Sequence, residues 1–162
     1  MFVLRTVLIA TIVLFAALIA GPWLALQFDA SFPPLPFPPW VHGIGIALIV
    51  LGATIAFFCT AAIFTPGSSR PAPYDAGGTF TIAGPYCFVR NPFMLGVILA
   101  LWGEAILLGR IVMMLYAVLL TWAIHLWVIF YEEPSLTKSL GKQYKDYQSS
   151  VPRWVPQFRK YD

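Results

Sequence analysis

Two adjacent carboxylates, Glu132 and Glu133, directly follow an uncharged apolar stretch at residues 111–131. Acidic side chains at the C-terminal end of a helix oppose the helix dipole, and neighbouring carboxylates repel each other unless a cation compensates them. A solvated helix end explains the position but not the pairing of the charges. The pair therefore predicts a cationic partner, which could be a basic side chain or a ligand.

Two further titratable side chains lie within the apolar stretches. His125 precedes Glu132 by seven residues, about two helical turns, so a regular helix places both on one face. A helix histidine can bond a neighbouring helix or serve a site, and both interpretations stay open. Glu104 lies deeper, where an ionisable residue is either functional or paired across a bundle.

The tripeptide Arg90-Asn91-Pro92 precedes another apolar stretch, at residues 91–103. An ordinary helix start explains much of it, because Asn is a good N-cap, Pro suits the first helical position and Arg anchors at lipid headgroups. The free backbone N–H groups of the same helix start could also bind a carboxylate or a phosphate. Both explanations are compatible with a cationic partner for the acidic pair.

The composition indicates that most of the chain is surrounded by lipid. Hydrophobic residues make up 59% of the 162 residues, charged residues only 10%, and the mean hydropathy is +0.78. A soluble domain carries about a quarter charged residues. Cys59 and Cys87 lie outside any metal-binding spacing, so we expect free thiols and no metal site. We predict one membrane domain over residues 1–162, with membrane lipids as partners and no nucleic acid.

Four apolar stretches predict an all-α polytopic protein with four transmembrane helices, near residues 4–27, 41–64, 92–108 and 111–131. The first stretch could also be read as a signal peptide, but its length favours a retained helix. The short Gly109-Arg110 connection forces the last two helices into an antiparallel hairpin. No Gly-x-x-x-Gly pair stands out on a free helix face, so no oligomeric state is predicted.

The distribution of basic residues predicts the orientation. Residues 29–40 contain five prolines and no Lys or Arg, whereas nine of the ten basic residues, all but Arg110, fall in the termini and the 65–90 loop. By the positive-inside rule these regions are cytoplasmic. The charge count fits a bacterial inner membrane and an endoplasmic reticulum membrane alike, and the small size of the chain favours the bacterial inner membrane.

Beyond Tyr131 the sequence predicts a cytoplasmic amphipathic segment over residues 134–157. Its helix is ended by Val151-Pro152-Arg153-Trp154-Val155-Pro156. Apolar residues recur there at helical spacing with lysines between them, so the segment would lie on the membrane surface or over the open end of the bundle. The apolar positions are Leu136, Leu140, Tyr144, Tyr147 and Val151. The tyrosines and Trp154 could also be plain interfacial aromatics.

A set of short motifs occurs over about residues 64–157. They are Gly84-Pro85-Tyr86, Arg90-Asn91-Pro92 with Gly96, Tyr131-Glu132-Glu133-Pro134 with Leu136, Gly141, Tyr144, Tyr147 and Val151-Pro152-Arg153. Taken together, they resemble the isoprenylcysteine carboxyl methyltransferase and phospholipid methyltransferase family of integral membrane enzymes. One position departs from the family pattern, because Met94 stands where relatives usually have a tyrosine; this bears on the acceptor more than on the cofactor.

The resemblance implies S-adenosylmethionine as methyl donor and a lipophilic acceptor, such as a phospholipid amine, a prenylated or fatty carboxylate or a small hydrophobic thiol. It implies Arg90 and Glu133 as the catalytic pair nearest the acceptor. Glu132 or Glu133 could hold the donor's diol or amine, the start of the third helix and Arg90 could hold its carboxylate, and Tyr86 or Tyr147 could pack on its adenine. The full set of implied cofactor-binding residues is Gly84, Tyr86, Asn91, Pro92, His125, Glu132, Tyr147 and Arg153.

Two alternatives remain at the level of sequence. Membrane sterol reductases share a similar C-terminal pattern but use NADPH, whose extra phosphate calls for more basic residues than this chain offers. A lipid-binding or partner-binding subunit without catalysis would also account for the ordinary explanations of Asn91, Pro92 and the tyrosines. Binding of S-adenosylhomocysteine or of NADPH would separate these possibilities.

Overall fold

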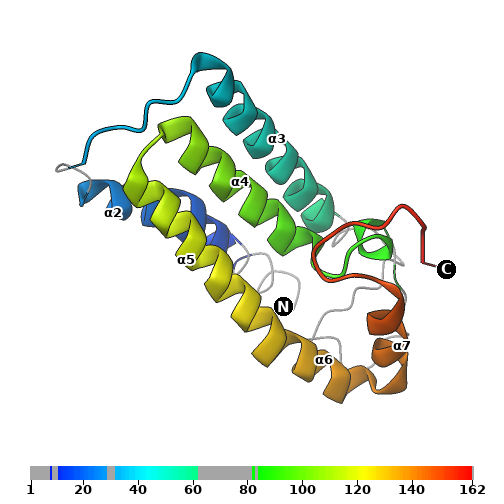
Figure 1. The fold of residues 1–162 in the computed structure, drawn as a ribbon. Coiled ribbons are helices and arrows are strands. Elements are labelled where there is room, and N and C mark those ends of the chain that lie inside the picture. The colour runs from blue at the N-terminus through cyan, green and yellow to red at the C-terminus, as the bar shows by residue number, and fades with distance from the viewer. Residues whose placement is uncertain (1–7, 9–10, 29–31, 62–81, 83, 162) are drawn as a thin grey trace.

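The computed structural model describes residues 8, 11–28, 32–61, 82 and 84–161, and the regular elements in this part of the chain are all helical (Figure 1). The predicted all-α class is confirmed for these residues. The elements are the π-helix η1 (Ala16–Ala20), α2 (Gly21–Gln27), α3 (Pro39–Ala61), the 3-10 helix η4 (Gly84–Cys87), α4 (Pro92–Leu108), α5 (Ile111–Trp127), the π-helix η5 (Val128–Glu132), α6 (Glu133–Leu140) and α7 (Lys142–Ser150).

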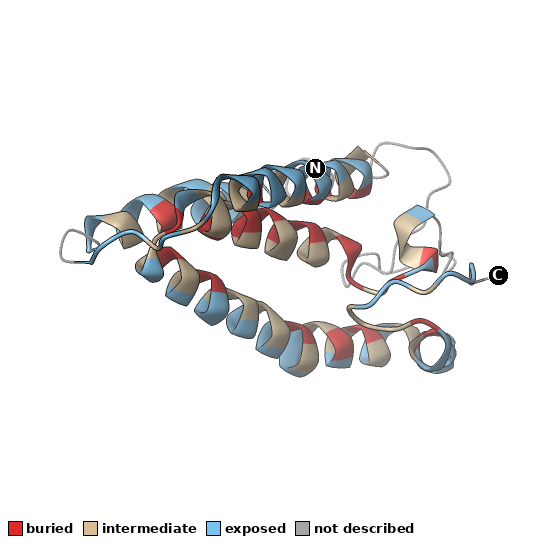
Figure 2. Ribbon diagram, turned by 45° about the horizontal axis from the view of Figure 1, so that its top comes forward, coloured by how far each residue is buried: buried red, intermediate tan, exposed pale blue. Residues whose placement is uncertain are grey.

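Two helices among the described residues are long and apolar enough to cross a membrane. They are α3, with 23 residues, and the continuous helix Ile111–Leu140, with 30 residues, which joins α5, η5 and α6. Thr11–Gln27 and α4 are apolar but shorter. Figure 2 shows that buried residues gather on the facing sides of the helices, while the outward faces are exposed. This apolar exterior indicates a membrane protein.

Helices α3 and α4 pack backbone to backbone along glycines spaced seven residues apart. A Cβ added at Gly45 would lie 2.8 Å from the carbonyl oxygen of Gly103, and one at Gly96 would lie 2.7 Å from that of Gly52. Real Cβ atoms do not come so close, so only glycine permits this approach. Because the N-terminal glycine of α3 meets the C-terminal glycine of α4, the two helices are antiparallel. We call this glycine contact between α3 and α4 the glycine seam. The Gly-x-x-x-Gly pattern does not reveal it, because its glycines are seven residues apart.

The predicted hairpin between α4 and α5 forms at Gly109, whose φ of 58° is left-handed and whose N–H bonds to Ala105 O at 3.1 Å. Glycine takes this conformation readily. A core of Leu101, Ala105, Met113 and Ala117 fills the hairpin near the turn. From there α4 and α5 separate towards the end where α6, α7 and the C-terminal residues lie (Figure 1). The predicted bounds 92–108 match α4.

Two predicted bounds on the C-terminal side differ from the structure. The helix expected to end at residue 131 continues to Leu140, because Pro134 falls in the first turn of α6, where a missing N–H costs nothing. The single amphipathic helix expected within 134–157 is instead α6 and α7, separated at Gly141 with φ 59° and ψ −126°. The helical part ends at Ser150, directly before the expected stop at Val151. The expected apolar face still converges, since Leu136, Tyr144, Tyr147 and Val151 form one buried cluster.

Candidate active site

Two arginines hold both carboxylate oxygens of Glu133. Arg153 donates from Nε to Oε1 at 2.7 Å and from a terminal nitrogen to Oε2 at 2.8 Å, and Arg90 donates to Oε1 at 2.9 Å. The Arg90 and Glu133 side chains are only 10% and 9% exposed. The predicted cationic partner of the acidic pair is thus provided by the protein. Because charge-assisted, bidentate contacts between planar groups are strong, Arg90, Glu133 and Arg153 form a rigid polar centre.

The three charged residues come from segments that are far apart in the sequence. Arg90 immediately precedes α4, Glu133 begins α6 and Arg153 follows α7. Backbone bonds hold the segment after α7 against the turn before α4: the N–H of Arg90 donates to Pro152 O at 2.9 Å, and that of Gln157 donates to Phe88 O at 2.9 Å. The C-terminal residues 151–161 therefore form part of the site.

Two buried polar atoms in this cluster have no hydrogen-bond partner among the described residues. They are Oε2 of Glu132 and Nε of Arg90. A buried acceptor or donor left unsatisfied costs about 1–3 kcal/mol, so such atoms are uncommon in folded proteins. A ligand that offers both a donor and an acceptor would satisfy them.

The tyrosines predicted to serve the site are mainly structural. Tyr147 is fully buried, and its hydroxyl donates to Tyr86 O at 2.8 Å, which anchors η4 to α7. Its ring is enclosed by Tyr144 and Tyr161 and has no free face for an adenine. Tyr86 is half-buried and keeps some accessible surface. Burial raises the pKa of Tyr144 to about 12, with the charge of Glu133 adding to the effect. Tyr144 is therefore neutral at physiological pH.

His125 reaches the same C-terminal segment. Its Nδ1 accepts a hydrogen bond from Trp154 Nε1 at 2.9 Å, and its ring meets Trp122 edge-on at 5.9 Å. The expected alignment of His125 with Glu132 is wrong, because the π-turn of η5 lies between them. The side chain of Glu133 contacts Arg153, the residue that precedes Trp154. His125 and Glu133 thus bind consecutive residues.

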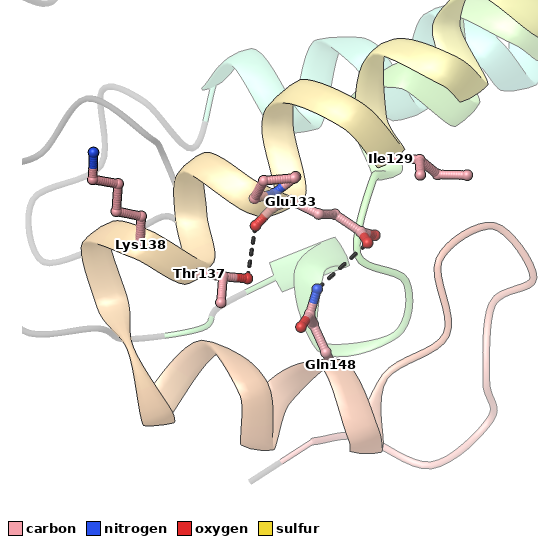
Figure 3. A pocket seen from close by; sticks show the side chains of 6 residues that line it. Ile129, Glu133, Thr137, Lys138 and Gln148 are labelled. Atoms are coloured by element: carbon pink, nitrogen blue, oxygen red, sulfur yellow. Dashed lines mark hydrogen bonds between the residues drawn. The ribbon is translucent and has the colours of Figure 1, made fainter.

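An open pocket of about 420 Å³ lies beside Glu133, between α6 and the end of α7 (Figure 3). Gln148 lines it and donates from Nε2 to Glu133 Oε2 at 3.4 Å, and Thr137 Oγ1 donates to Glu133 O at 2.8 Å. The volume falls within the range of small-molecule sites. The pocket lining consists of Ile129, Glu133, Pro134, Thr137, Lys138 and Gln148.

The start of α4 differs in detail from the expected helix cap. Asn91 occupies the N-cap position, but its side chain makes no capping bond and donates instead to Arg153 O at 3.5 Å. Pro92 is buried in the first turn, as predicted. Gly84, with φ 62°, is exposed at the start of η4. The first turn of α4 thus keeps backbone N–H groups without side-chain caps next to Arg90.

Sequence reasoning missed how three C-terminal residues assemble this site. The family motif implies a cofactor-binding role for Arg153, and in the structure this residue is the bidentate partner of Glu133. No motif points to Gln148, and position near the membrane surface favours an interfacial role for Trp154, whereas both residues contact the site. Their partners lie 15 to 29 residues away, so no local spacing could have indicated the contacts.

The chain is similar in sequence to known methyltransferases. Residues 40–143 match the family model described as phospholipid methyltransferase. Protein-S-isoprenylcysteine O-methyltransferase A of Arabidopsis thaliana is 30% identical over 129 residues, which cover 77% of this chain and 64% of that protein. Methanethiol S-methyltransferase 2 of Bradyrhizobium diazoefficiens is 36% identical over 138 residues, covering 76% and 51%. The chain spans about half to two thirds of the length of these relatives. It belongs to the phospholipid methyltransferase family.

Proposed function

We propose that the chain is an integral membrane methyltransferase that moves a methyl group from S-adenosylmethionine to a lipophilic acceptor. The observation that supports this most directly is the contact between Arg90 and Glu133, at 2.9 Å, inside the segment that matches the family. The printed names of both relatives describe methyltransferases, which favours methyl transfer over the NADPH-dependent reductase and over a non-catalytic subunit.

The residues present fit this donor. Its amino group and ribose hydroxyls are hydrogen-bond donors, and the buried Oε2 of Glu132 is an acceptor without a partner among the described residues. Its carboxylate suits the uncapped first turn of α4, beside Asn91 and Pro92. We assign Tyr86, Gly84 and His125 to the surroundings of the donor, and Tyr147 and Arg153 to the support of that site.

S-adenosylmethionine supplies a methyl group activated by a sulfonium cation. Transfer by in-line displacement depends mainly on holding the acceptor at about 3–3.5 Å from that methyl in a water-poor site. In our proposal Arg90 orients an anionic group of the acceptor, and Glu133 steers the nucleophile or accepts its proton. Arg153 and Gln148 fix the Glu133 carboxylate, which limits its freedom before the acceptor arrives.

We further propose four transmembrane helices, with both termini and the α6–α7 region on the cytoplasmic side of a bacterial inner membrane. The first helix and α4 are short for a full span, yet their apolar faces pack on α5 and α3. The acceptor would then enter from the bilayer and the donor from the cytosol. Candidate acceptors are a phospholipid amine, a prenylated or fatty carboxylate and a hydrophobic thiol.

Calorimetric titration of the detergent-purified protein with S-adenosylhomocysteine, and separately with NADPH, tests the proposal. We expect binding of the first only; binding of NADPH only would refute methyl transfer, and binding of neither would favour a non-catalytic subunit. A labelled donor with a total lipid extract, a prenylated carboxylate and an alkane thiol would then identify the acceptor class.

Two variants test the assigned roles. Glu133→Gln and Arg90→Ala should abolish turnover while the helical content stays unchanged, and the exposed Lys145→Gln serves as the matched control. Unchanged turnover in both variants would remove the roles that we assign to this pair.

A further inference from the structure

A π-turn immediately precedes Glu133. The helix Ile111–Leu140 is α-helical up to Trp127, becomes the π-helix η5 over Val128–Glu132 and returns to α-helix at Glu133. The N–H of Glu133 bonds to the carbonyl oxygen of Val128, five residues back instead of four. Such a turn accommodates one residue more than an α-turn, and it shifts every later side chain backwards around the helix.

This shift changes which carboxylate shares a face with His125. In an uninterrupted α-helix seven residues make about two turns, so Glu132 would align with His125 and Glu133 would point about 80° away. In the structure His125 accepts a bond from Trp154, and Glu133 binds the adjacent Arg153. Because the π-turn Val128–Glu132 lies between them, the eight residues from His125 to Glu133 should cover about the rotation that seven cover in an α-helix.

The two acidic side chains consequently have different surroundings. Both oxygens of Glu133 accept hydrogen bonds from Arg90, Arg153 or Gln148, whereas Oε2 of Glu132 is buried with no partner in the described part of the chain. Because Glu132 and Glu133 have the same side chain, their different hydrogen bonding arises from the direction in which the helix points each of them.

We infer that the π-turn Val128–Glu132 is a one-residue register shift that selects Glu133, and not Glu132, as the partner of Arg90 and Arg153. This rests on the proposed function only where it concerns activity; the positional claim stands on the contacts alone. The extra residue can be removed at Phe130, which is 75% exposed and lines no pocket among those described.

Deletion of Phe130 tests the inference, because it should turn η5 into regular α-helix and leave Glu133 facing Arg90. The matched control is deletion of Leu119, which is 69% exposed in the regular part of α5 and whose loss rotates Glu133 by about 100°. Each deletion is combined with Arg90→Gln, Glu133→Gln and both. We expect the Tm shifts of the two substitutions to be non-additive by roughly 4 °C or more in the unaltered chain and without Phe130, but additive without Leu119.

A folded protein without Phe130 in which the Arg90 and Glu133 shifts are additive would overturn the inference. Should that deletion prevent folding, the unaltered chain decides. There, Arg153→Gln must be non-additive with Glu133→Gln and additive with Glu132→Gln, and the reverse pattern would overturn the inference.

The thermal measurements do not depend on catalysis. If the unaltered protein binds no S-adenosylhomocysteine, the proposed function fails, while the Tm cycles still decide the register shift. If it does bind, the protein without Phe130 should bind within about threefold of the unaltered affinity, and the protein without Leu119 should lose binding at least tenfold. Loss of binding in both deletions alike would count against the register shift.

Discussion

Helix α4 and Arg90 before it contact the rest of the protein in two different ways. Along its length α4 meets α3 through glycines, so that the backbones touch and no side chain intervenes. Before its first turn, Arg90 meets Glu133 and Arg153 through charge. In lipid, apolar side chains gain little by leaving the solvent, so close packing of small residues joins helices within the bilayer. Charged groups that are removed from water need an opposite charge and hydrogen-bond partners, which Glu133 provides for both arginines.

The glycine contacts and the charged cluster serve different purposes: the first fixes two helices against each other, and the second leaves polar groups available to a ligand. The glycine seam contains no polar side chain and tolerates no added volume, whereas the charged cluster retains unsatisfied atoms and adjoins an open pocket. We therefore expect changes in the seam to act on folding and changes in the cluster to act on ligand binding as well.

The largest expected effect is that of added volume in the seam. Gly52→Leu places a Cβ against the carbonyl oxygen of Gly96, where backbone cannot give way. We expect the free energy of unfolding to fall by about 3 kcal/mol. Denaturant titration in mixed micelles measures it. Gly43→Leu is the control, because a Cβ there has nothing within 4 Å; equal losses in the two variants would show that the seam is not tightly packed.

Removal of the central charge should come next. Glu133→Gln leaves Arg90 without its nearly buried counterion and removes the bidentate contact of Arg153, which is 29% exposed. Breaking a buried pair costs about 3–5 kcal/mol, and the exposure of Arg153 reduces this to about 2 kcal/mol here. The exposed Asp146→Asn is the control in the same denaturant titration. A loss in Asp146→Asn as large as that in Glu133→Gln would show that carboxylate position is irrelevant.

A smaller effect is expected where the C-terminal segment meets α5. Trp154→Phe keeps the aromatic ring but removes the N–H that bonds to His125 Nδ1. One hydrogen bond contributes about 1 kcal/mol, so unfolding should become easier by that amount. Because residues 151–161 cover the site, S-adenosylhomocysteine should also bind several-fold more weakly in calorimetry. Trp40→Phe, at an exposed position, should change neither quantity. If Trp154→Phe bound S-adenosylhomocysteine with unchanged affinity, the bond between Trp154 and His125 would not contribute to ligand binding.

The smallest effect is confined to alkaline pH. Burial raises the pKa of Tyr144 to about 12, from the ordinary tyrosine value of about 10. The folded state therefore disfavours the phenolate, so the contribution of this group to stability is complete below pH 10 and is lost as the pH rises towards 12. In Tyr144→Phe this loss is absent, and Tm should fall less steeply between pH 10 and 12 than in the unaltered protein. Tyr131→Phe, with an exposed ring, should keep the original slope.

Local composition predicted several features well. The bounds of α4 follow from Pro92 at its start and Gly109 after its end, and the hairpin follows from the short connection to α5. The need for a cation beside Glu133 follows from the position of two carboxylates at the end of an apolar helix. Each of these arguments uses residues adjacent in sequence, whose preferences act before the chain folds.

Contacts between segments that are distant in the sequence could not be predicted from the sequence. The glycines at positions 45, 52, 96 and 103 were visible in the sequence, yet their pairing depends on which helix lies alongside α3. Gln148 and Trp154 carried no local signal, because their partners lie 15 and 29 residues away. The π-turn has no signature of its own, since Val128–Glu132 would suit an α-helix equally well.

The amino-acid sequence by itself determined the apolar helical character of the chain, the family to which it belongs and the few charged residues that a site could use. Only the tertiary structure decided which of the two glutamates meets the arginines, and that α3 and α4 touch through glycine. Hydrophobicity and capping depend on each residue and its near neighbours. The direction of a side chain, by contrast, depends on every turn of the helix that precedes it and on the surfaces that it meets.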